Sequence, residues 1–358
     1  MSGDSRKGIV TMAHGSGGAD SAALLKDVFL RHFCGETLAK LEDSAVVVIN
    51  ADADGRARRL AVSTDSFVVT PLVFPGGDIG KLAVCGTVND VLMSGAEPRW
   101  LACGFIIEAG LEISLLDDIC ASMAAAAREA GVEIIAGDTK VIEGRGEGGG
   151  LIINTTGIGV FRPFASTGSS GLEMMRQPAP SGIRPGDAII LSGNLGDHHA
   201  AILSARMGIK NAIKSDCALL TPIISALREA GIAAHAMRDL TRGGLGTILN
   251  ELATASKVSI ILEEEFVPVS AEVRAFCGIL GLDPVYMGNE GKAAIAVAPE
   301  DREKALGAMR QTGIGQNAVC IGTAAANHPP APAVVMKTRL GGTVRIDILH
   351  GEGLPRIC

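Results

Sequence analysis

The sequence lacks paired cysteine motifs, an excess of basic residues and any long apolar run. Its eight cysteines form no CxxC pair and no cluster with histidine at zinc-ligand spacing, which argues against a zinc site and favours reduced thiols. The net charge of −7 argues against a nucleic-acid partner, because such partners are bound by clustered basic surfaces. No apolar run reaches membrane-spanning length, and residues 1–7 lack the apolar core of a signal peptide. We therefore expect a cytoplasmic protein without a membrane or nucleic-acid partner.

The 358 residues are 47% hydrophobic and 20% charged, as is typical of soluble globular proteins. This length favours two domains of the usual size, roughly 150 residues each. Helix and strand patterns alternate along the chain in two parts, which predicts two α/β-layered domains. A stretch rich in Pro, Ser and Gly lies at 162–186 and separates them. We place the domains at 1–170 and 171–332, followed by a hairpin and tail at 333–358.

The chain ends in a cysteine, Cys358. Two strands expected at 334–338 and 343–350 form a hairpin. Beyond it, two glycines loosen the backbone and Pro355 blocks strand pairing, so we expect a flexible C-terminal tail. A thiol on a mobile arm suits a nucleophile or carrier that travels to a fixed site. The alternative is a frayed chain end that happens to finish in cysteine.

A glycine-rich loop precedes a predicted helix at 21–34. The loop consists of His14, Gly15, Ser16, Gly17 and Gly18. Its backbone N–H groups and the N-terminus of the helix are suited to phosphate oxygens. Because the loop does not match the GxxxxGKS pattern, a plain turn is the alternative.

Three aspartates stand next to predicted strands or within an apolar helix. Asp43 leads into one strand, Asp65 follows the strand expected at 60–62, and Asp90 lies on an otherwise apolar helix. A carboxylate on such a helix is costly to bury unless it is paired or bound to a cation. The alternative for each aspartate alone is a helix cap or a turn.

A fourth aspartate and a lysine follow another strand. The strand predicted at 132–136 runs into Asp138 and Lys140, which we expect at the strand's end, where ligand sites of α/β layers form. Several carboxylates and one ammonium group are what Mg²⁺ with a triphosphate requires. These residues together predict an ATP site.

Two further polar segments lie in the second half. Asp239, Thr241 and Arg242 stand before a helix at 247–256 and fit phosphate contact from a second domain, although a helix-capping turn gives the same pattern. Glu290 lies ahead of a strand expected at 293–297, where it serves as a base or faces solvent.

Taken in order, the motifs resemble the HypE family of hydrogenase maturation factors. They are His-Gly-Ser-Gly-Gly at 14–18, Gly-Asp-Thr-Lys-Val at 137–141, Asp-Leu-Thr-Arg-Gly-Gly at 239–244, Asn-Glu-Gly-Lys at 289–292 and the terminal Pro-Arg-Ile-Cys. The internal motifs are typical of the wider superfamily of aminoimidazole ribonucleotide synthetase, selenophosphate synthetase and thiamine-monophosphate kinase. The cysteine motif is the part specific to HypE. The resemblance covers nearly the whole chain and implies the α+β aminoimidazole ribonucleotide synthetase-like fold, with the N-terminal sheets of two protomers pairing in a homodimer.

The resemblance also implies an ATP-dependent carbamoyl dehydratase. HypF would load a carbamoyl group onto Cys358. The chain would convert this thiocarboxamide into a thiocyanate, and cyanide would pass towards the iron held by HypC and HypD during maturation of [NiFe]-hydrogenase. Phosphorylation by ATP would turn the amide oxygen into a leaving group while a base removes the N–H protons.

Roles follow residue by residue from the same resemblance. Cys358 would be the carrier, and Lys140 and Glu290 would position and deprotonate the thiocarbamate, with phosphate binding as the alternative role of Lys140. Mg²⁺ would be bound by Asp43, Asp65, Asp90 and Asp138. ATP would be bound by His14, Gly15, Ser16, Gly17, Gly18, Asp65, Asp90, Asp138, Lys140, Asp239, Thr241 and Arg242.

Two other interpretations remain open. A kinase or synthetase of the same superfamily would act on a free small molecule and would keep its turnover without Cys358. A non-catalytic scaffold would dock a partner or metal through the terminal thiol and would consume no ATP. The scaffold interpretation leaves the many acids around the nucleotide loop unexplained.

Overall fold

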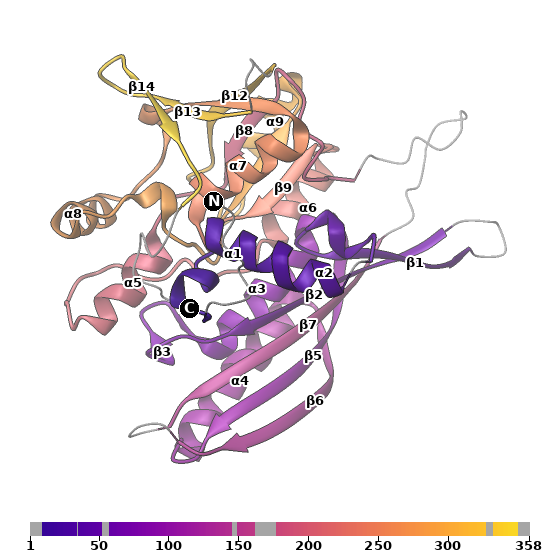
Figure 1. Cartoon of the computed structure of the whole chain (residues 1–358), viewed down its shortest axis with the longest axis vertical. Helices are drawn as coiled ribbons and strands as arrows, with labels where there is room; N and C mark the ends of the chain where they lie inside the picture. Colours follow the sequence, from indigo (N-terminus) through magenta and orange to yellow (C-terminus); the bar gives the residue numbers. More distant parts are fainter. Residues whose placement is uncertain are drawn as a thin grey trace.

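The structure is a computed structural model that describes residues 9–33, 35–51, 57–144, 149–161, 177–326 and 332–349. Its strands form two large sheets with helices packed against them (Figure 1). This arrangement confirms the expected α+β class. Within the described part of the chain, no helix combines the length and the apolar character needed to cross a membrane.

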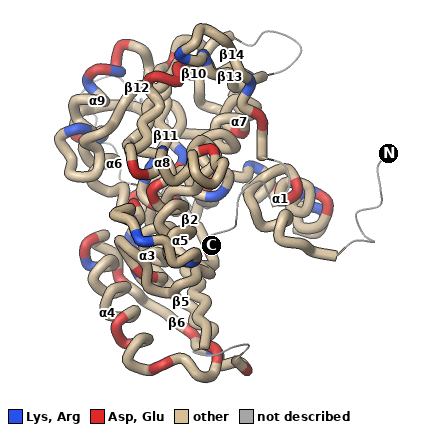
Figure 2. The backbone as a smooth tube through the Cα atoms, turned by 90° about the vertical axis from the view of Figure 1, so that its left-hand side faces the viewer, with Lys and Arg blue, Asp and Glu red and all other residues tan. Residues whose placement is uncertain are grey.

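The first sheet has five strands in the order β1-β2-β7-β5-β6. Their bounds are β1 Ala45–Ala51, β2 Ala57–Phe67, β5 Glu97–Glu108, β6 Glu133–Ile142 and β7 Leu151–Val160. Neighbours are antiparallel except β5 and β6, which run parallel and are joined by helix α4 (Ile113–Ala130). Helices α3 (Ile79–Met93) and α4 lie on one face of this sheet, and the opposite face of β5 and β6 carries no helix in Figures 1 and 2.

Helix α3 lies between the two halves of the molecule. Of its 15 residues, all except Lys81 and Asp90 are buried, as is typical of a helix that is apolar on every side. It contacts β2 and β7 of the first sheet, and also β9 and α6 of the second half. The helix packs closely on β7 at Gly159, where a Cβ atom would lie 2.4 Å from Val91 Cγ1. Helix α3 therefore carries Asp90 to the junction between the two halves.

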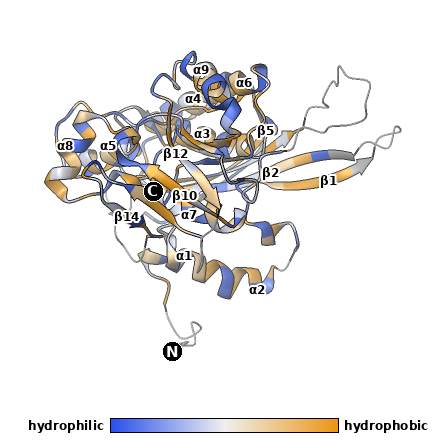
Figure 3. Cartoon of the chain, turned by 90° about the horizontal axis from the view of Figure 1, so that it is seen from above, coloured by the Kyte–Doolittle hydropathy of each residue, from blue (hydrophilic) through white to orange (hydrophobic). Residues whose placement is uncertain are grey.

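The second sheet has seven strands in the order β14-β13-β10-β12-β8-β11-β9. Their bounds are β8 Ala188–Leu191, β9 Ala236–Asp239, β10 Val258–Glu263, β11 Ala293–Val297, β12 Val319–Ala326, β13 Val334–Lys337 and β14 Thr343–Ile346. Only β10 and β13 pair in parallel among these neighbours. Apolar residues dominate β10 and β12, which Figure 3 draws mostly in its hydrophobic colours.

Helices cover both faces of the second sheet. Helices α6 (Thr221–Glu229) and α9 (Arg302–Arg310) pack on one face, and α7 (Gly244–Ser256) packs on the other. Every residue of β8 and β11 is consequently buried. The cluster on the α6 and α9 side also contains residues of α3, α4 and the first sheet, so one apolar core runs from the first half into the second. Helices α5 (Asp197–Arg206) and α8 (Ala271–Leu280) share a smaller core beside it.

The N-terminal helical segment stands apart from both sheets. It comprises α1 (Ala19–Leu24), a π-helical turn (Leu25–Phe29) and α2 (Leu30–His32), none of which contains a buried residue. Figures 2 and 3 show it to one side of the body. The sequence predicted this helix, but its apolar Val28 and Phe29 are exposed rather than packed against the core.

Two strand predictions were too short. Strand β2 continues to Phe67, so Asp65 lies within it, and β6 continues to Ile142, so Asp138 and Lys140 do not lie at a strand's end. In β6 the residues Gly137 and Asp138 lower the local strand propensity, yet main-chain pairing with β5 runs through them. The domain boundaries at 1–170, 171–332 and 333–358 stay a prediction, and β13 and β14 extend the second sheet.

Candidate active site

Three aspartates from distant parts of the chain converge at the junction of the two halves. Asp43 lies in the loop before β1, Asp90 on α3, and Asp239 at the end of β9. One carboxylate oxygen of each lies within 4.8 Å of the other two. Within the described residues this is the one group of three or more ligand-type side chains with that spacing. We call these three residues the acidic group.

Neighbouring side chains fix the orientation of these carboxylates. Arg238 Nε lies 2.6 Å from Asp43 Oδ1, and the same guanidinium lies 3.3 Å from Glu251 on α7. The Ser63 hydroxyl on β2 donates a hydrogen bond of 2.7 Å to Asp90 Oδ2. A single arginine therefore neutralises part of the negative charge and joins β9, α7 and the loop before β1.

Burial and like charge act together on the acidic group. Burial raises the pKa of Asp43 and Asp90 well above the ordinary range, and raises the pKa of Asp239 to about 6. At Asp90, the nearby carboxylates of Asp239 and Asp43 raise the pKa further. Arg238 opposes the rise at Asp43 and Asp239. Clustered buried carboxylates with too few cations around them are a fitting donor set for a hard divalent cation.

Asp65 and Arg242 lie next to the acidic group. Arg242 precedes α7, and its guanidinium lies 3.8 Å from Asp65 Oδ1 on β2. Burial raises the pKa of Asp65, and Arg242 opposes that rise. Thr241 is the neighbour of Arg242 in the same loop, where its carbonyl accepts a hydrogen bond of 3.1 Å from the Gly244 N–H. The structure therefore brings the predicted Asp65, Thr241 and Arg242 to one place.

The glycine-rich loop lies over Arg242. A Cβ atom at Gly17, whose φ is +79°, would lie 2.9 Å from Arg242 Cβ, so this close contact requires glycine. At Gly18 a Cβ atom would lie 2.1 Å from the Leu349 carbonyl oxygen. His14 is used within the loop, where its Nδ1 accepts a hydrogen bond of 3.0 Å from the Thr11 N–H. Gly17 and Gly18 therefore lie between Arg242 and Leu349.

The last described residues are held in place on both sides. Ile346 is buried in the core under α7. Main-chain carbonyl groups of the segment accept hydrogen bonds at three positions, from Asn250 Nδ2 to Ile346 (2.8 Å), from the Tyr286 hydroxyl to Asp347 (2.9 Å) and from the Ala19 N–H to Leu349 (3.0 Å). The predicted carrier Cys358 lies outside the described residues.

Glu290 approaches the acidic group from the loop before β11. Burial raises its pKa well above the ordinary range, and the nearby carboxylates of Asp239, Asp216 and Asp65 raise it further. A Cβ atom at Gly86 of α3 would lie 3.8 Å from Glu290 Oε2. Glu290 is thus a partly buried acid next to α3, and its role as a base stays a prediction.

Asp138 and Lys140 lie elsewhere, contrary to the expected single cluster. They lie on β6, the edge strand, and pair with each other at 2.5 Å while both side chains remain about two-thirds exposed (71% and 67%). The hydrogen bond from Lys140 lowers the pKa of Asp138. Register pairs Asp138 with Gly104, Gly104 with Asn154, and Asn154 with Ser66 beside Asp65. Three strand spacings, about 14 Å, separate the two backbones.

Sequence reasoning missed several residues of the site. They are Ser63, Asn89, Asp216, Arg238, Glu251 and Lys292. Arg238 had one signal, since it stands directly before the motif that begins at Asp239. Asp216 has none, because it lies in an irregular segment between α5 and α6.

Comparisons with known proteins identify the family and the fold. The N-terminal domain model of AIR synthase related proteins matches residues 41–161, and the corresponding C-terminal domain model matches residues 184–332. Over 351 residues the chain is 46% identical to the carbamoyl dehydratase HypE of Rhodobacter capsulatus, covering 98% of both chains. The chain belongs to the HypE family. The predicted family and the aminoimidazole ribonucleotide synthetase-like fold are therefore confirmed.

Two solved structures of HypE proteins resemble the chain along nearly its whole length. One is HypE in a HypE–HypF complex, with a TM-score of 0.80 and 39% identity, covering 91% of this chain and 100% of that one. The other is HypE in complex with ATP, with a TM-score of 0.77 and 44% identity, covering 98% and 100%. Both HypE structures thus share the overall fold of this chain.

A pH-dependent difference in stability tests the electrostatics of the acidic group. Because the pKa of Asp239 is about 6 in the fold and ordinarily 3.8, folding favours its protonated form between these values. Without a divalent cation, the free energy of unfolding should therefore fall as pH rises from about 4 to about 6. Asp239→Asn removes this cost, so its Tm relative to wild type should rise by a few degrees over that window and stay level above it.

Thermal unfolding in EDTA, from pH 4 to pH 8, measures this difference. Asp118→Asn, at an exposed position of α4, is the control and should track wild type throughout. A Tm difference between Asp239→Asn and wild type that stays constant across the range would contradict the raised pKa of Asp239 in the folded state.

Proposed function

We propose that the chain is an ATP-dependent carbamoyl dehydratase that acts on its own Cys358 during the maturation of [NiFe]-hydrogenase. Family membership gives the reaction class, since relatives with 46% identity over almost the entire length are carbamoyl dehydratases named HypE. The observation that carries the proposal is the acidic group at the junction of the halves, with the root of the tail held beside the glycine-rich loop.

The reaction balances with ATP as the acceptor of the oxygen atom. The carbonyl oxygen of the Cys358 S-carboxamide attacks the γ-phosphorus, the bond to ADP breaks, and the oxygen becomes part of a phosphate leaving group. Two protons leave the nitrogen as the carbon–nitrogen triple bond forms, and the carbon–oxygen bond breaks. The products are Cys358 thiocyanate, ADP and phosphate. Phosphorylation is needed because an amide oxygen is otherwise a poor leaving group.

The acidic group would hold Mg²⁺, with Asp65 beside it. Mg²⁺ bound there would offset the negative charge of the triphosphate. ATP binding is supported by the HypE–ATP complex, whose chain is 44% identical to this one. Arg242 and the backbone N–H groups of the glycine-rich loop are placed to contact phosphate oxygens, and Glu290 would act as the base that removes the nitrogen protons.

We expect the C-terminal tail to bring Cys358 to this site. The Leu349 carbonyl accepts a hydrogen bond from the N–H of Ala19, the residue directly after the glycine-rich loop, and Cys358 follows nine residues later. Nine residues span at most about 30 Å when extended. The position of Leu349 therefore favours delivery of the thiol to the acidic group of the same chain.

The proposed partners follow the same reaction. HypF would supply the carbamoyl group, and a HypE–HypF complex is among the structures that the chain resembles at 39% identity. HypC and HypD would accept the cyanide. A cytoplasmic location stays a prediction, based on the absence of paired cysteine motifs.

A homodimer would also explain the placement of Asp138 and Lys140. The edge strands of the first sheet carry exposed apolar side chains, among them Val48 of β1 and Ile135 and Val141 of β6. An apolar, unpaired edge strand is a template for pairing with another strand. If two copies pair through these sheets, Asp138 and Lys140 would lie at the interface between the copies and contribute to it.

Intact-protein mass tests the dehydratase directly. After incubation with HypF, carbamoyl phosphate, ATP and Mg²⁺, wild type should gain a carbamoyl group and then lose the mass of water in proportion to ATP hydrolysed. Cys358→Ala should gain nothing, and Cys120→Ala, which removes an exposed thiol of α4, should behave as wild type. ATP turnover on a small molecule by both wild type and Cys358→Ala would favour a superfamily kinase. Binding of partners without any ATP hydrolysis would favour the scaffold.

Sedimentation velocity tests the dimer. Val141→Asp places a charge on the exposed edge strand and should convert a wild-type dimer to monomer. Leu340→Asp changes a side chain that is 98% exposed in the turn between β13 and β14 and should leave the dimer intact. A wild-type monomer, or a dimer unaffected by Val141→Asp, would contradict this interface.

A further inference from the structure

The loop that carries Glu290 is fixed by contacts on both sides of that residue. The Asn289 side chain donates to the Leu240 carbonyl (3.3 Å) and accepts from the Gly196 N–H (2.8 Å). A Cβ atom at Gly291 would lie 2.0 Å from the Asp216 carbonyl oxygen, so the irregular segment before α6 crosses the loop in direct contact. Little room remains for the backbone of Glu290 to move.

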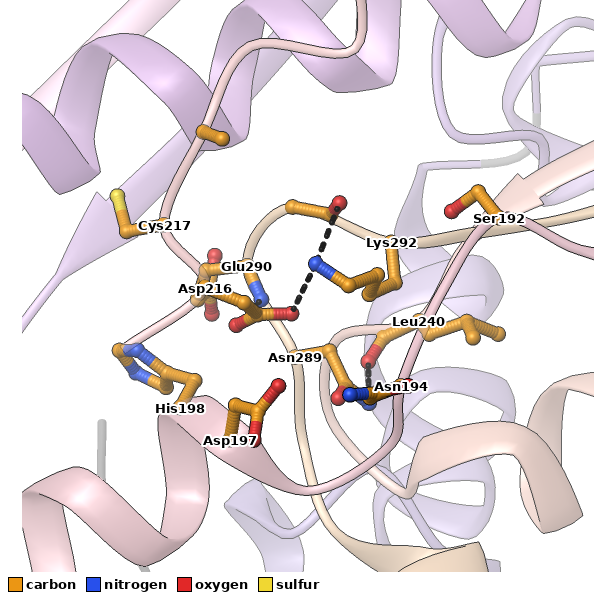
Figure 4. A network of polar contacts seen from close by, with 12 residues as sticks. Ser192, Asn194, Asp197, His198, Asp216, Cys217, Leu240, Asn289, Glu290 and Lys292 are labelled. Atoms are coloured by element: carbon orange, nitrogen blue, oxygen red, sulfur yellow. Dashed lines mark hydrogen bonds and ion pairs between the residues drawn. The ribbon is translucent and has the colours of Figure 1, made fainter. Parts of the chain in front are cut away.

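Asp216 is the side chain that joins this crossing segment to the loop. Its carboxylate is 3% exposed, accepts a hydrogen bond of 3.0 Å from the Glu290 N–H, and lies 3.3 Å from Lys292 Nζ. Figure 4 shows Lys292 reaching back between the Asp216 carboxylate and the carbonyl of the loop, at 3.3 Å from Gly291 O. Asp216 and Lys292 thus contact the backbone of the loop at Glu290 and at Gly291.

Three further contacts connect the Asp216–Lys292 pair and the Glu290 loop to the elements around the site. Lys292 passes over Gly193, where a Cβ atom would lie 2.8 Å from Lys292 Cε. Asn89, the residue before Asp90 on α3, donates to the Glu290 carbonyl (3.4 Å) and to the Ala218 carbonyl (3.0 Å). The same helix therefore positions both Asp90 and the Glu290 loop.

The energetics of such a pair favour a role other than stability. Removing two opposite charges from water costs free energy that their attraction often fails to return, and well-packed apolar replacements are frequently neutral or stabilising. The pair nevertheless supplies a fixed acceptor for the Glu290 N–H. What it contributes is geometry at Glu290, and a misplacement of about 1 Å in a reacting group can slow catalysis roughly 100-fold.

We infer that the buried Asp216–Lys292 ion pair is a positioning pair for Glu290 in the dehydration of the carbamoylated thiol. Neither residue needs to touch the substrate, because both act through the backbone that carries Glu290. The inference rests on the proposed function and adds two residues to it.

The decisive variant replaces both charges with apolar side chains of similar size, Asp216→Leu with Lys292→Met. The readouts are the single-turnover rate at which the preformed carbamoyl adduct loses the mass of water, the Kd for ATP and the Tm. We expect the rate to fall about 100-fold while the Kd for ATP stays within about twofold and the Tm stays within a few degrees. Lys292→Arg alone keeps the positive charge but carries it on a planar guanidinium. This variant should recover part of the rate that the double variant loses.

Asp187→Ala is the matched control. Asp187 is also buried (2%), accepts a backbone N–H from Arg184 at 2.8 Å and pairs with His235 at 2.7 Å. It lies before β8, at the opposite end of that strand from Ser192, whose hydroxyl accepts from the Ala293 N–H next to Lys292. This variant should lose stability while its folded fraction dehydrates at the wild-type rate.

Each outcome separates the inference from the proposed function. If wild type keeps its adduct when ATP is present, the proposed function is wrong and the inference falls with it. If wild type dehydrates and the double variant does so within about threefold of that rate, only the inference is wrong. A joint loss of rate, ATP affinity and Tm in the double variant would show a structural role and would also overturn it.

Discussion

The structure depends on the burial of like charges where its two halves meet. Asp43 and Asp90 come from the first half and Asp239 from the second, and their oxygens lie within 4.8 Å of one another. Without a cation this arrangement is unfavourable, as the raised pKa values of all three residues indicate. The surrounding core compensates, because α3 is buried on nearly every side and one apolar cluster runs through both halves. The acidic group thus lowers the free energy of unfolding, and a bound divalent cation would relieve the repulsion between its carboxylates.

The same packing connects chemistry to delivery. Helix α3 presents Asp90 to the acidic group and Asn89 to the Glu290 loop. Helix α7 begins beside Arg242 and, through Asn250, holds the strand end from which the C-terminal segment departs. The glycine-rich loop contacts both Arg242 and Leu349. A change in the position of Arg242 would therefore alter the position of Leu349, where the C-terminal segment begins, because the glycine-rich loop contacts both residues directly.

Local sequence identified the residues whose context was unusual. A carboxylate within an apolar helix, as at Asp90, and one beside glycine and arginine, as at Asp239, stand out because burial of charge requires a partner. The sequence likewise predicted the glycine-rich loop, and Gly17 does adopt a positive φ. The two layered parts followed from the alternation of helices and strands, and the α+β class followed from the family resemblance.

The remaining parts of the site depend on contacts between residues that are far apart in the sequence. The Arg238–Asp43 pair forms only once β9 lies beside the loop before β1, and no motif marks Asp216 in its irregular segment. Asp138 and Lys140 were misplaced because their local motif was given too much weight. Their motif suggested a strand end, whereas pairing with β5 extends the strand past them and leaves them on an exposed edge.

Counting bound Mn²⁺ by electron paramagnetic resonance, with a non-hydrolysable ATP analogue present, tests the acidic group most directly. Wild type and the control Asp118→Asn should bind the ion with equal affinity. Asp90→Asn removes one of the three carboxylates and should weaken binding at least about tenfold, since even the outer partners of metal ligands contribute that much. Equal Mn²⁺ affinity in Asp90→Asn and wild type would contradict the assignment of the cation and nucleotide site to Asp43, Asp90 and Asp239.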